Sequence, residues 1–496
     1  MDIALINQAV IASIQWQNVV AVLIGVTWGV VVGALPGLGS VLAITMLLPF
    51  TFGMEQIPAV SMLLATYAGS VYGGSLSAIM INTPGTPQSA ATCLDGYPMA
   101  QQGNADLALG WATVASVIGG LLSCCILILA APQLAAFAVR FGPVETFALI
   151  ILGLTCVASI SQGSIIKGLL AAVIGLFMAS VGPDPIVPSY RFTFGIFELS
   201  GGLNLIALVV GVFALSEVFS RICQVNKKGG GGIITGKGLR YPKFAEIRKR
   251  IWLAIKSALI GSGIGILPGT GAATAAFISY ADAKRSSLRR DEMGHGEPDG
   301  IVAAEAANNA VTGGALVPSL ALGIPGDAVT AVMLATLTIK GITPGVRLMV
   351  ENPVTVYAAF MALILSNLLL PLTGWCSAKG FSRLLKTPEP LLLTAVTLFC
   401  FIGTYTVNGL IFDLWIMFFA GILGFIMRLF QIPVAALVIG LVLGPQLELS
   451  LRQGLIVTNN DFASFFSLDH PIALFLFLLT LVMLFLPLIK SYHKHK

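Results

Sequence analysis

Residues 33–39 read Gly33-Ala34-Leu35-Pro36-Gly37-Leu38-Gly39, and this glycine- and proline-rich stretch returns at residues 265–271 as Gly265-Ile266-Leu267-Pro268-Gly269-Thr270-Gly271. Both copies lie within apolar sequence. Proline removes a backbone donor and glycine accepts conformations that other residues resist, so a helix that runs into either copy should be interrupted there. The sequence therefore predicts two broken helices at equivalent places along the chain.

A second pair of motifs follows the first in the same order. Gly73-Gly74-Ser75, leading to Asn82-Thr83-Pro84-Gly85, matches Gly313-Gly314-Ala315, leading to Gly323-Ile324-Pro325-Gly326, at an offset of 240 to 241 residues. Motifs that recur in one order indicate an internal repeat. We expect a first membrane half at 1–223, a basic linker at 224–250 and a second membrane half at 251–496.

The composition indicates a membrane protein. Of the 496 residues, 56% are hydrophobic and 10% are charged, whereas soluble domains carry about 25% charged residues. Apolar stretches of about 20 residues, the length that crosses a bilayer once, recur from Val19 to Ile489. We expect an all-α polytopic membrane protein with roughly ten to fourteen spans in a lipid bilayer, and no nucleic-acid partner.

The basic residues predict the topology. Nine of the 27 Lys and Arg residues fall between Arg221 and Arg250, opposed by a single acid, which favours a cytoplasmic loop. Segments 284–290 and 490–496 are also basic and are expected in the cytoplasm, whereas the proline-rich segment 183–200 is expected in the periplasm. The first repeat copy follows a segment without Lys or Arg and the second follows the basic loop. An inverted repeat is therefore favoured.

The helix breaks also predict a binding site. Unwound backbone at membrane depth is tolerated only where it is buried in protein or lines a wet cavity, so breaks at repeat-related positions, as re-entrant hairpins or interrupted helices, indicate a site near the midplane. No Lys or Arg occurs in the motif-bearing segments 33–92, 257–283 and 303–339. We expect an anion there to be held by backbone N–H groups at half-helix N-termini, without a side-chain cation.

The candidate substrate-binding residues all lie in or beside these breaks. They are Pro36, Gly37, Gly39, Asn82, Thr83, Pro84, Gly85, Thr86, Ser89, Pro268, Gly269, Thr270, Gly271, Pro325, Gly326 and Thr330. The alternative for each hydroxyl is ordinary hydrogen bonding between helices. The alternative for each proline or glycine is a kink or a close helix contact, both of which are frequent in membrane helices.

Two acidic residues and two amides are candidates for coupling a cation. Asp327 directly follows Pro325-Gly326, and Glu305 begins the run Glu305-Ala306-Ala307-Asn308-Asn309. Charged groups at membrane depth are expensive and suggest a function, so we expect Asp327, Glu305, Asn308 and Asn309 to hold a cation or relay a proton. The alternatives are a helix N-cap for Asp327 and a place at the membrane interface for Glu305.

The sequence carries no enzymatic or metal-binding signature. Residues 231–237 resemble a phosphate-binding loop, but Gly238 stands where Ser or Thr must bind magnesium. The four histidines fall in loops or in the C-terminal tail. We expect no catalytic residue, no metal and no cofactor, so that transport would draw on an ion gradient or on the ATPase of another subunit.

Five runs, spread in order along the chain, carry a family resemblance. They are Gly33-Ala34-Leu35-Pro36-Gly37-Leu38-Gly39, Leu94-Asp95-Gly96-Tyr97-Pro98-Met99-Ala100-Gln101-Gln102-Gly103, Tyr190-Arg191-Phe192-Thr193-Phe194, Ala304-Glu305-Ala306-Ala307-Asn308-Asn309-Ala310 and Ile342-Thr343-Pro344-Gly345. The sequence resembles the large TctA-type subunit of bacterial tripartite tricarboxylate transporters in these runs and in its overall length.

That resemblance implies a multi-pass protein of the bacterial inner membrane. It implies a permease that works with a small membrane subunit and a periplasmic solute-binding protein, driven by sodium ions or protons. The implied substrates are citrate, other di- and tricarboxylates, and aromatic acids. The loop Asn82-Thr83-Pro84-Gly85-Thr86-Pro87-Gln88-Ser89 departs from citrate-type members, which carry an acidic residue just after the equivalent Pro-Gly. The substrate therefore stays open within organic acids.

Two other kinds of protein remain as alternatives from the sequence. An anion channel could also use broken helices without basic residues, and saturable, gradient-driven uptake would distinguish a carrier from it. An intramembrane enzyme would need a nucleophile with a base, and it would leave the paired glycine-proline breaks unexplained. A secondary transporter permease that imports a small organic acid by cation symport is the function that the sequence favours.

Overall fold

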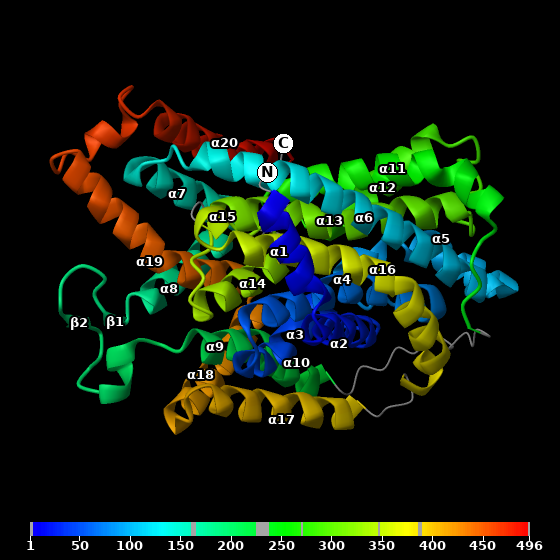
Figure 1. Ribbon diagram of the computed structural model, residues 1–496, viewed down its shortest axis with the longest axis horizontal. Coiled ribbons are helices and arrows are strands. Elements are labelled where there is room, and N and C mark those ends of the chain that lie inside the picture. The colour runs from blue at the N-terminus through cyan, green and yellow to red at the C-terminus, as the bar shows by residue number, and fades with distance from the viewer. Residues whose placement is uncertain are drawn as a thin grey trace.

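The structure is a computed structural model that describes residues 3–159, 165–224, 238–268, 271–345, 348–384 and 389–494. Residues 225–237 of the predicted linker lie outside these ranges. Within them the chain is mainly helical, and the only strands are β1 (Gly182–Pro183) and β2 (Tyr190–Arg191), which pair antiparallel with Gly182 opposite Arg191. The prediction of an all-α fold is confirmed (Figure 1).

The helices before the basic linker begin and end as follows: α1 (Ile3–Ile14), α2 (Trp16–Gly33), α3 (Gly39–Leu47), η1 (Leu48–Gly53), α4 (Gln56–Ile81), η2 (Pro87–Ala90), α5 (Cys93–Met99), η3 (Ala100–Asn104), α6 (Ala105–Ala138), α7 (Pro143–Ser159), α8 (Ile165–Ala179), η4 (Phe197–Gly201), α9 (Leu205–Val209), η5 (Val210–Leu215) and α10 (Ser216–Gln224). Of the short elements labelled η, η3 and η5 are π-helices and the others are 3₁₀-helices.

The helices after the linker are α11 (Phe244–Ile266), α12 (Ala272–Ser286), α13 (Pro298–Leu322), α14 (Ala328–Ile339), α15 (Leu348–Glu351), α16 (Pro353–Leu384), α17 (Glu389–Asn408), α18 (Ile411–Leu429), α19 (Val434–Val457), η6 (Ala463–Phe466) and α20 (Pro471–Lys494). Helices end at all four predicted breaks: α2 and α11 at the first pair of motifs, and α4 and α13 at the second pair.

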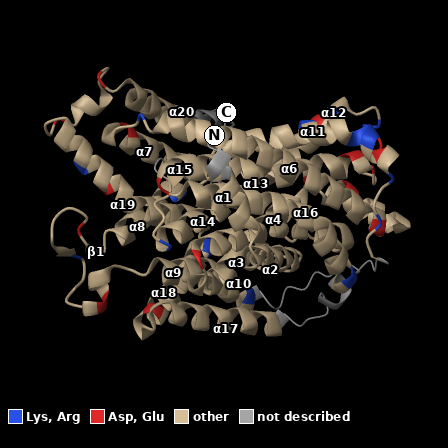
Figure 2. Ribbon diagram, in the orientation of Figure 1, with Lys and Arg blue, Asp and Glu red and all other residues tan. Residues whose placement is uncertain are grey.

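The helices have the length and composition of a polytopic membrane protein. Seven helical segments of the described chain are long and apolar enough to cross a bilayer, and five more apolar helices are shorter. Figure 2 shows the charged residues mostly toward the two ends of the long axis, with few between them. The chain is thus a multi-pass membrane protein, while the count of ten to fourteen spans stays a prediction, since it depends on how the shorter helices sit in the bilayer.

The two ends of the long axis carry the segments that were predicted on opposite sides of the membrane. The β1–β2 hairpin, within the predicted periplasmic segment, lies at one end, and the connection from α12 to α13, which holds the basic segment 284–290, lies at the other (Figure 1). Within the membrane part, α2 packs along α4 and α11 packs along α13. Whether the two halves are inverted relative to each other stays a prediction.

The two halves share their core. Helix α13 of the second half packs along α6 of the first, α16 packs on α4, and α19 packs on α8. At one end, a buried carboxylate joins them: Asp95 Oδ1 accepts hydrogen bonds from the backbone N–H groups of Gly294, Gly296 and Glu297 at 2.8–2.9 Å, and Oδ2 accepts one from Tyr280 at 2.8 Å. The loop before α13 is therefore fastened to α5.

Charged side chains also fasten the hairpin to α19. Arg191 donates to both carboxylate oxygens of Glu448 at 2.7 and 3.0 Å, and Arg452 donates to both oxygens of Asp184 at 3.1 and 3.0 Å. Backbone N–H groups of the turn donate hydrogen bonds to Asp184 and lower its pKa to about 2, and the bond from Val187 has the largest effect. Asp184 is therefore a carboxylate throughout the neutral pH range, and the tie persists there.

Glycine lets α2 and α4 approach each other at backbone distance. A Cβ added to Gly29 would lie 2.4 Å from the Thr66 carbonyl oxygen, and the same contact recurs one turn away on either side. The glycines that share this contact are Gly25 and Gly33 of α2, with Gly69 and Gly73 of α4 facing back. Small residues at membrane helix interfaces permit such packing. The pair is thus held by close contact between two backbones.

We predict that Gly29→Ala lowers the stability of the purified protein by about 1–3 kcal/mol, the usual cost of overpacking, because the added methyl group forces α2 away from α4. The matched control is Gly263→Ala in α11, since nothing lies within 4 Å of a Cβ at Gly263. Thermal unfolding in detergent measures both variants. Equal melting temperatures for the two would show that the α2–α4 contact is not close-packed.

Candidate functional site

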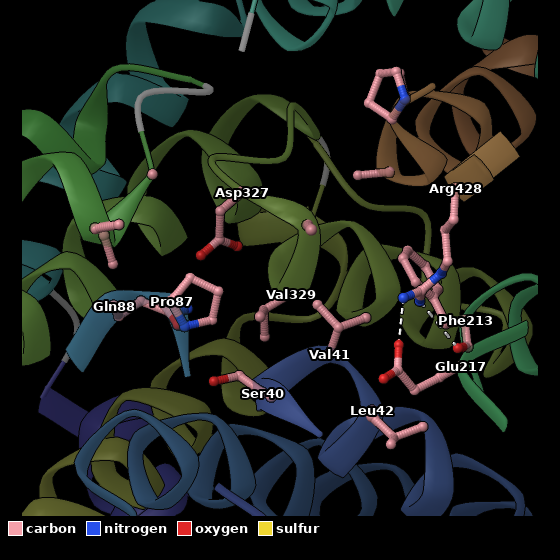
Figure 3. A pocket seen from close by; sticks show the side chains of 18 of the residues that line it. Ser40, Val41, Leu42, Pro87, Gln88, Phe213, Glu217, Asp327, Val329 and Arg428 are labelled. Atoms are coloured by element: carbon pink, nitrogen blue, oxygen red, sulfur yellow. Dashed lines mark hydrogen bonds and ion pairs between the residues drawn. The ribbon is translucent and has the colours of Figure 1, made fainter. Parts of the chain in front are cut away.

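The interrupted helices surround one cavity. Its volume is about 840 Å³, and Figure 3 shows side chains from both halves around it. Each of the four breaks contributes lining residues: Gly37, Leu38, Gly39 and Ser40 from the first, Pro87 and Gln88 from the segment after the second, Gly271, Ala272 and Ala273 from the third, and Asp327, Ala328 and Val329 from the fourth. Segments that are hundreds of residues apart therefore meet at one site.

The break between α2 and α3 depends on two glycines in the left-handed region. Gly37 has φ +82° and Gly39 has φ +72°, conformations that other residues adopt only with strain. A Cβ at Gly37 would lie 2.0 Å from Nη2 of Arg221, whereas nothing lies within 4 Å of a Cβ at Gly39. The same Nη2 donates to the Pro36 carbonyl oxygen at 2.6 Å. The glycine at 37 thus makes room for a guanidinium group beside the break.

The equivalent break between α11 and α12 is described in part. Pro268 follows the end of α11, and Gly271, with φ +74°, directly precedes α12 and lines the cavity. The candidates Gly269 and Thr270 lie outside the described residues. As at Gly39, nothing lies within 4 Å of a Cβ at Gly271, so its role is conformational.

The breaks after α4 and α13 have matching geometry. Each helix ends on a residue in the left-handed region, Asn82 with φ 52° and Gly323 with φ 72°. The chain then turns back, so that the Gly85 N–H donates to Gly74 O at 3.3 Å and a Cβ on Gly326 would lie 2.7 Å from Ala315. Gly74 and Gly85 of the first contact correspond to Ala315 and Gly326 of the second, since each lies 241 residues earlier in the chain. The two breaks thus turn back in a similar way, while the internal repeat itself stays a prediction.

Asp327 caps α14 and also faces the cavity. Its Oδ1 accepts hydrogen bonds from the Thr330 backbone N–H at 2.8 Å and the Thr330 hydroxyl at 2.9 Å, and its Oδ2 accepts one from Tyr67 of α4 at 2.5 Å. The alternative of an N-cap is thus correct, and it does not exclude a binding role because the side chain also lines the cavity (Figure 3).

The equivalent first-half loop carries hydroxyls where the second carries Asp327 and Thr330. Thr86 and Ser89 are both buried, and Thr86 Oγ1 donates to Ser89 Oγ at 3.4 Å. Pro87 and Gln88 between them line the cavity. The Gln88 Oε1 is buried and has no hydrogen-bond partner within the described chain, and the same is true of Ser40 Oγ on the opposite break. Two residues that line the cavity therefore each keep a buried polar atom without a partner in the described chain.

Glu305 lies in a separate buried cluster between α13 and α6. Its side chain is fully buried within the protein, while its depth relative to the membrane interface is not defined by this burial. Thr92 donates to its Oε1, and Ser116 donates to its Oε2 at 3.0 Å. Asn309 Nδ2 donates to Ser116 Oγ at 2.8 Å, while both polar side-chain atoms of Asn308 are buried without a partner in the described part of the chain. The side chains of Thr92, Ser116 and Asn309 thus gather around one carboxylate.

The expectation that the site lacks a side-chain cation is wrong. Arg428, in the last turn of α18, lines the cavity and donates to Glu217 of α10, which also lines it. Arg221 approaches the same carboxylate from the other side, with its Nε 2.9 Å from Glu217 Oε1. The motif segments indeed hold no Lys or Arg, but the fold brings these side chains to them from elsewhere. Arg428 and Glu217 each lie within an apolar run of the sequence. A charged residue at membrane depth is the feature that could have indicated their place at the site.

Some of the residues predicted to form the site line the cavity, and the others do not. Four of the candidates line it, namely Gly37, Gly39, Gly271 and Asp327. The described candidates that do not line it are Pro36, Asn82, Thr83, Pro84, Gly85, Thr86, Ser89, Pro268, Pro325, Gly326, Thr330, Glu305, Asn308 and Asn309. Most of these shape the breaks, whereas Asn82 and Thr83 are exposed. Binding roles for all of them stay predictions.

Comparison with known proteins identifies the family. The model of the Tripartite tricarboxylate transporter TctA family matches residues 19–439. The chain belongs to this family. A TctA protein is a membrane component of tripartite transporters, and the family is not an enzyme family. A transporter role is therefore supported over an intramembrane enzyme.

Two relatives from Agrobacterium vitis agree with this assignment. The chain is 37% identical, over 478 residues, to an uncharacterized 52.8 kDa protein in the TAR-I ttuC' 3' region, covering 96% of this chain and 94% of the relative. It is 35% identical, over 231 residues, to an uncharacterized protein in the TAR-II ttuC' 3' region, covering 47% of this chain and 95% of that relative. No solved structure matches the chain.

The contact between Gly37 and Arg221 gives a prediction for this TctA protein. Gly37→Ala and Gly39→Ala should both cost about 1–2 kcal/mol for a left-handed alanine. Gly37→Ala should cost about 1 kcal/mol more, because its methyl group displaces the guanidinium from Pro36 O. Thermal unfolding of both variants, alone and combined with Arg221→Ala, measures the difference. An excess cost at Gly37 that persists without Arg221 would contradict this account.

Proposed function

We propose that this protein is the large permease subunit of a bacterial tripartite transporter. It imports a small organic acid, a di- or tricarboxylate or an aromatic acid, across the inner membrane by symport with sodium ions or protons. It receives the acid from a periplasmic solute-binding protein and works beside a small membrane subunit. Membership of the TctA family supports the transporter role, and the cavity supports the choice of an anion.

The observation that carries the proposal is the meeting of helix N-termini at the cavity. The first residues of α3, α12 and α14 all line it, namely Gly39, Ala272 and Ala328. The N-terminus of a helix presents free backbone N–H groups and a partial positive charge, which suit a carboxylate. Three such ends and Arg428 offer donors to an anion, in a wall that also holds the carboxylates of Glu217 and Asp327.

Two acidic positions support cation coupling. Asp327 presents a carboxylate to the same cavity that would hold the acid. Glu305, with Asn308 and Asn309, offers oxygen atoms in a fully buried cluster. Carboxylate and carbonyl oxygens are hard ligands suited to a small cation, and a carboxylate also takes up a proton. Either group therefore fits the coupling role.

Uptake into proteoliposomes tests the proposal. We expect vesicles with this chain and its small subunit to accumulate radiolabelled di- or tricarboxylates or aromatic acids only when the binding protein and one imposed gradient, of sodium ions or protons, are both present. Uptake should saturate with the acid. Gradient-independent, non-saturating flux would instead indicate an anion channel, and absence of flux for every acid would overturn the proposal.

For Asp327→Asn we expect a change in cation dependence without loss of the fold. Asparagine caps a helix about as well as aspartate, so α14 should still begin at the same place. Loss of the charge should raise the cation concentration for half-maximal uptake about tenfold or more, as expected when a contact to a charged group is lost. Asp469→Asn, at an exposed position, is the control. Unchanged cation dependence in Asp327→Asn would remove this residue from the coupling site.

A further inference from the structure

The guanidinium of Arg428 is the cavity's own cation, and neither the motifs nor the family match points to it. We propose that Arg428 binds a carboxylate group of the transported acid, and that Arg428 pairs with the carboxylate of Glu217 when no acid is bound. The inference rests on the proposed transport of an organic acid and adds the residue that recognises it. It is carried by the arrangement of three charged side chains at one wall.

Arg428 is positioned to reach a ligand. It extends from the last turn of α18, and its side chain is 35% exposed, toward the cavity that it lines. Figure 3 shows it on the opposite side of the cavity from Asp327, with contacts to Glu217 and to the Phe213 carbonyl. A ligand between Arg428 and Asp327 would therefore meet a positive group at one end and a negative group at the other.

The present partners of Arg428 leave its binding capacity incomplete. A guanidinium has five N–H donors. Here Nη1 donates to Glu217, Nη2 makes a long contact of 3.4 Å to Phe213 O, and Nε is buried with no partner in the described part of the chain. A planar carboxylate accepts two parallel bonds from such a fork, which is the geometry that favours arginine in carboxylate recognition.

Glu217 can release Arg428 because a second guanidinium holds it. Arg221, one turn further along α10, has its Nε 2.9 Å from Glu217 Oε1, and it is itself held by the Pro36 carbonyl at 2.6 Å. One carboxylate thus serves two guanidinium groups, and the cluster has a net charge of +1. If the carboxylate of an incoming acid pairs with Arg428, Glu217 stays paired with Arg221. No charge is then left without a partner in the protein interior.

The segment that carries Glu217 is irregular in a manner often found at functional sites. The π-helix η5 (Val210–Leu215) directly precedes α10, and π-helical turns within helices are frequent at such sites. η5 also supplies Phe213, whose carbonyl is the second partner of Arg428 and whose side chain lines the cavity. The local distortion therefore brings Glu217 and this carbonyl to the same guanidinium.

A purely structural ion pair between α10 and α18 would behave differently. In that case, removing either partner would weaken the protein and its ligand binding together. If Glu217 instead competes with the acid, the two neutral variants should act in opposite directions. Arg428→Gln should weaken binding of the acid, and Glu217→Gln should strengthen it. The sign of the Glu217→Gln effect therefore separates the two explanations.

The test is direct binding to the purified full chain in phosphatidylcholine nanodiscs. The probes are succinate, citrate and benzoate, with succinamide as the uncharged analogue of succinate. We expect the Kd of the bound acid to rise about tenfold or more in Arg428→Gln, as for loss of a charge-assisted contact, and less in Arg428→Lys. It should fall in Glu217→Gln and stay unchanged in Arg290→Gln, whose side chain is 70% exposed at the loop before α13. Succinamide should not bind.

Each outcome decides between defined possibilities. If an acid binds to the wild type and its Kd is unchanged in Arg428→Gln and Arg428→Lys, the inference is overturned. The proposed function then still stands. Weaker binding in Glu217→Gln also overturns it and favours a structural ion pair. No binding of any carboxylate to wild type overturns the proposed function and this inference with it. If Arg428→Gln does not fold, Arg428→Lys and Glu217→Gln decide the matter.

A further arm separates the transported acid from a lipid headgroup, which is also anionic. Nanodiscs with added phosphatidylglycerol should leave the Kd of the acid unchanged when the acid itself is the ligand of Arg428. Competition by phosphatidylglycerol that disappears in Arg428→Lys would assign Arg428 to the lipid and overturn the inference.

Discussion

The structure depends on one constraint, which is that backbone N–H and C=O groups inside a bilayer must find partners within the protein. A helix satisfies its own groups, but each break frees several of them. In this protein the four breaks meet around one cavity, so the cost of interrupting four helices is confined to one place. Elsewhere, glycines such as Gly29 bring the backbones of neighbouring helices into close contact.

The sequence was sufficient to predict the breaks because glycine and proline act locally. Gly37 and Gly39 adopt left-handed conformations that glycine accepts without strain, and Asp327 caps the helix that begins beside it. These are properties of a few consecutive residues. The predicted internal repeat then indicated that the breaks belong together, before any contact between them was known.

What the sequence could not predict are contacts between distant segments. Arg428 and Glu217 are 211 residues apart, and no pattern in either apolar run indicates that they meet. The cluster around Glu305 likewise draws on Thr92 and Ser116 of the other half. The number of spans was also beyond sequence reasoning, since hydropathy identifies apolar stretches but does not tell a short helix that crosses from one that turns back.

Helix α19 joins two parts of the molecule that otherwise lie far apart. Its first turns, at Ala435, Ala436 and Ile439, line the cavity, and its later turns hold the hairpin through Glu448 and Arg452. At 1.5 Å per residue, about 20 Å separates Ile439 from Arg452. One helix, with Pro445 between its two ends, therefore connects the wall of the cavity to the ion pairs that hold the hairpin.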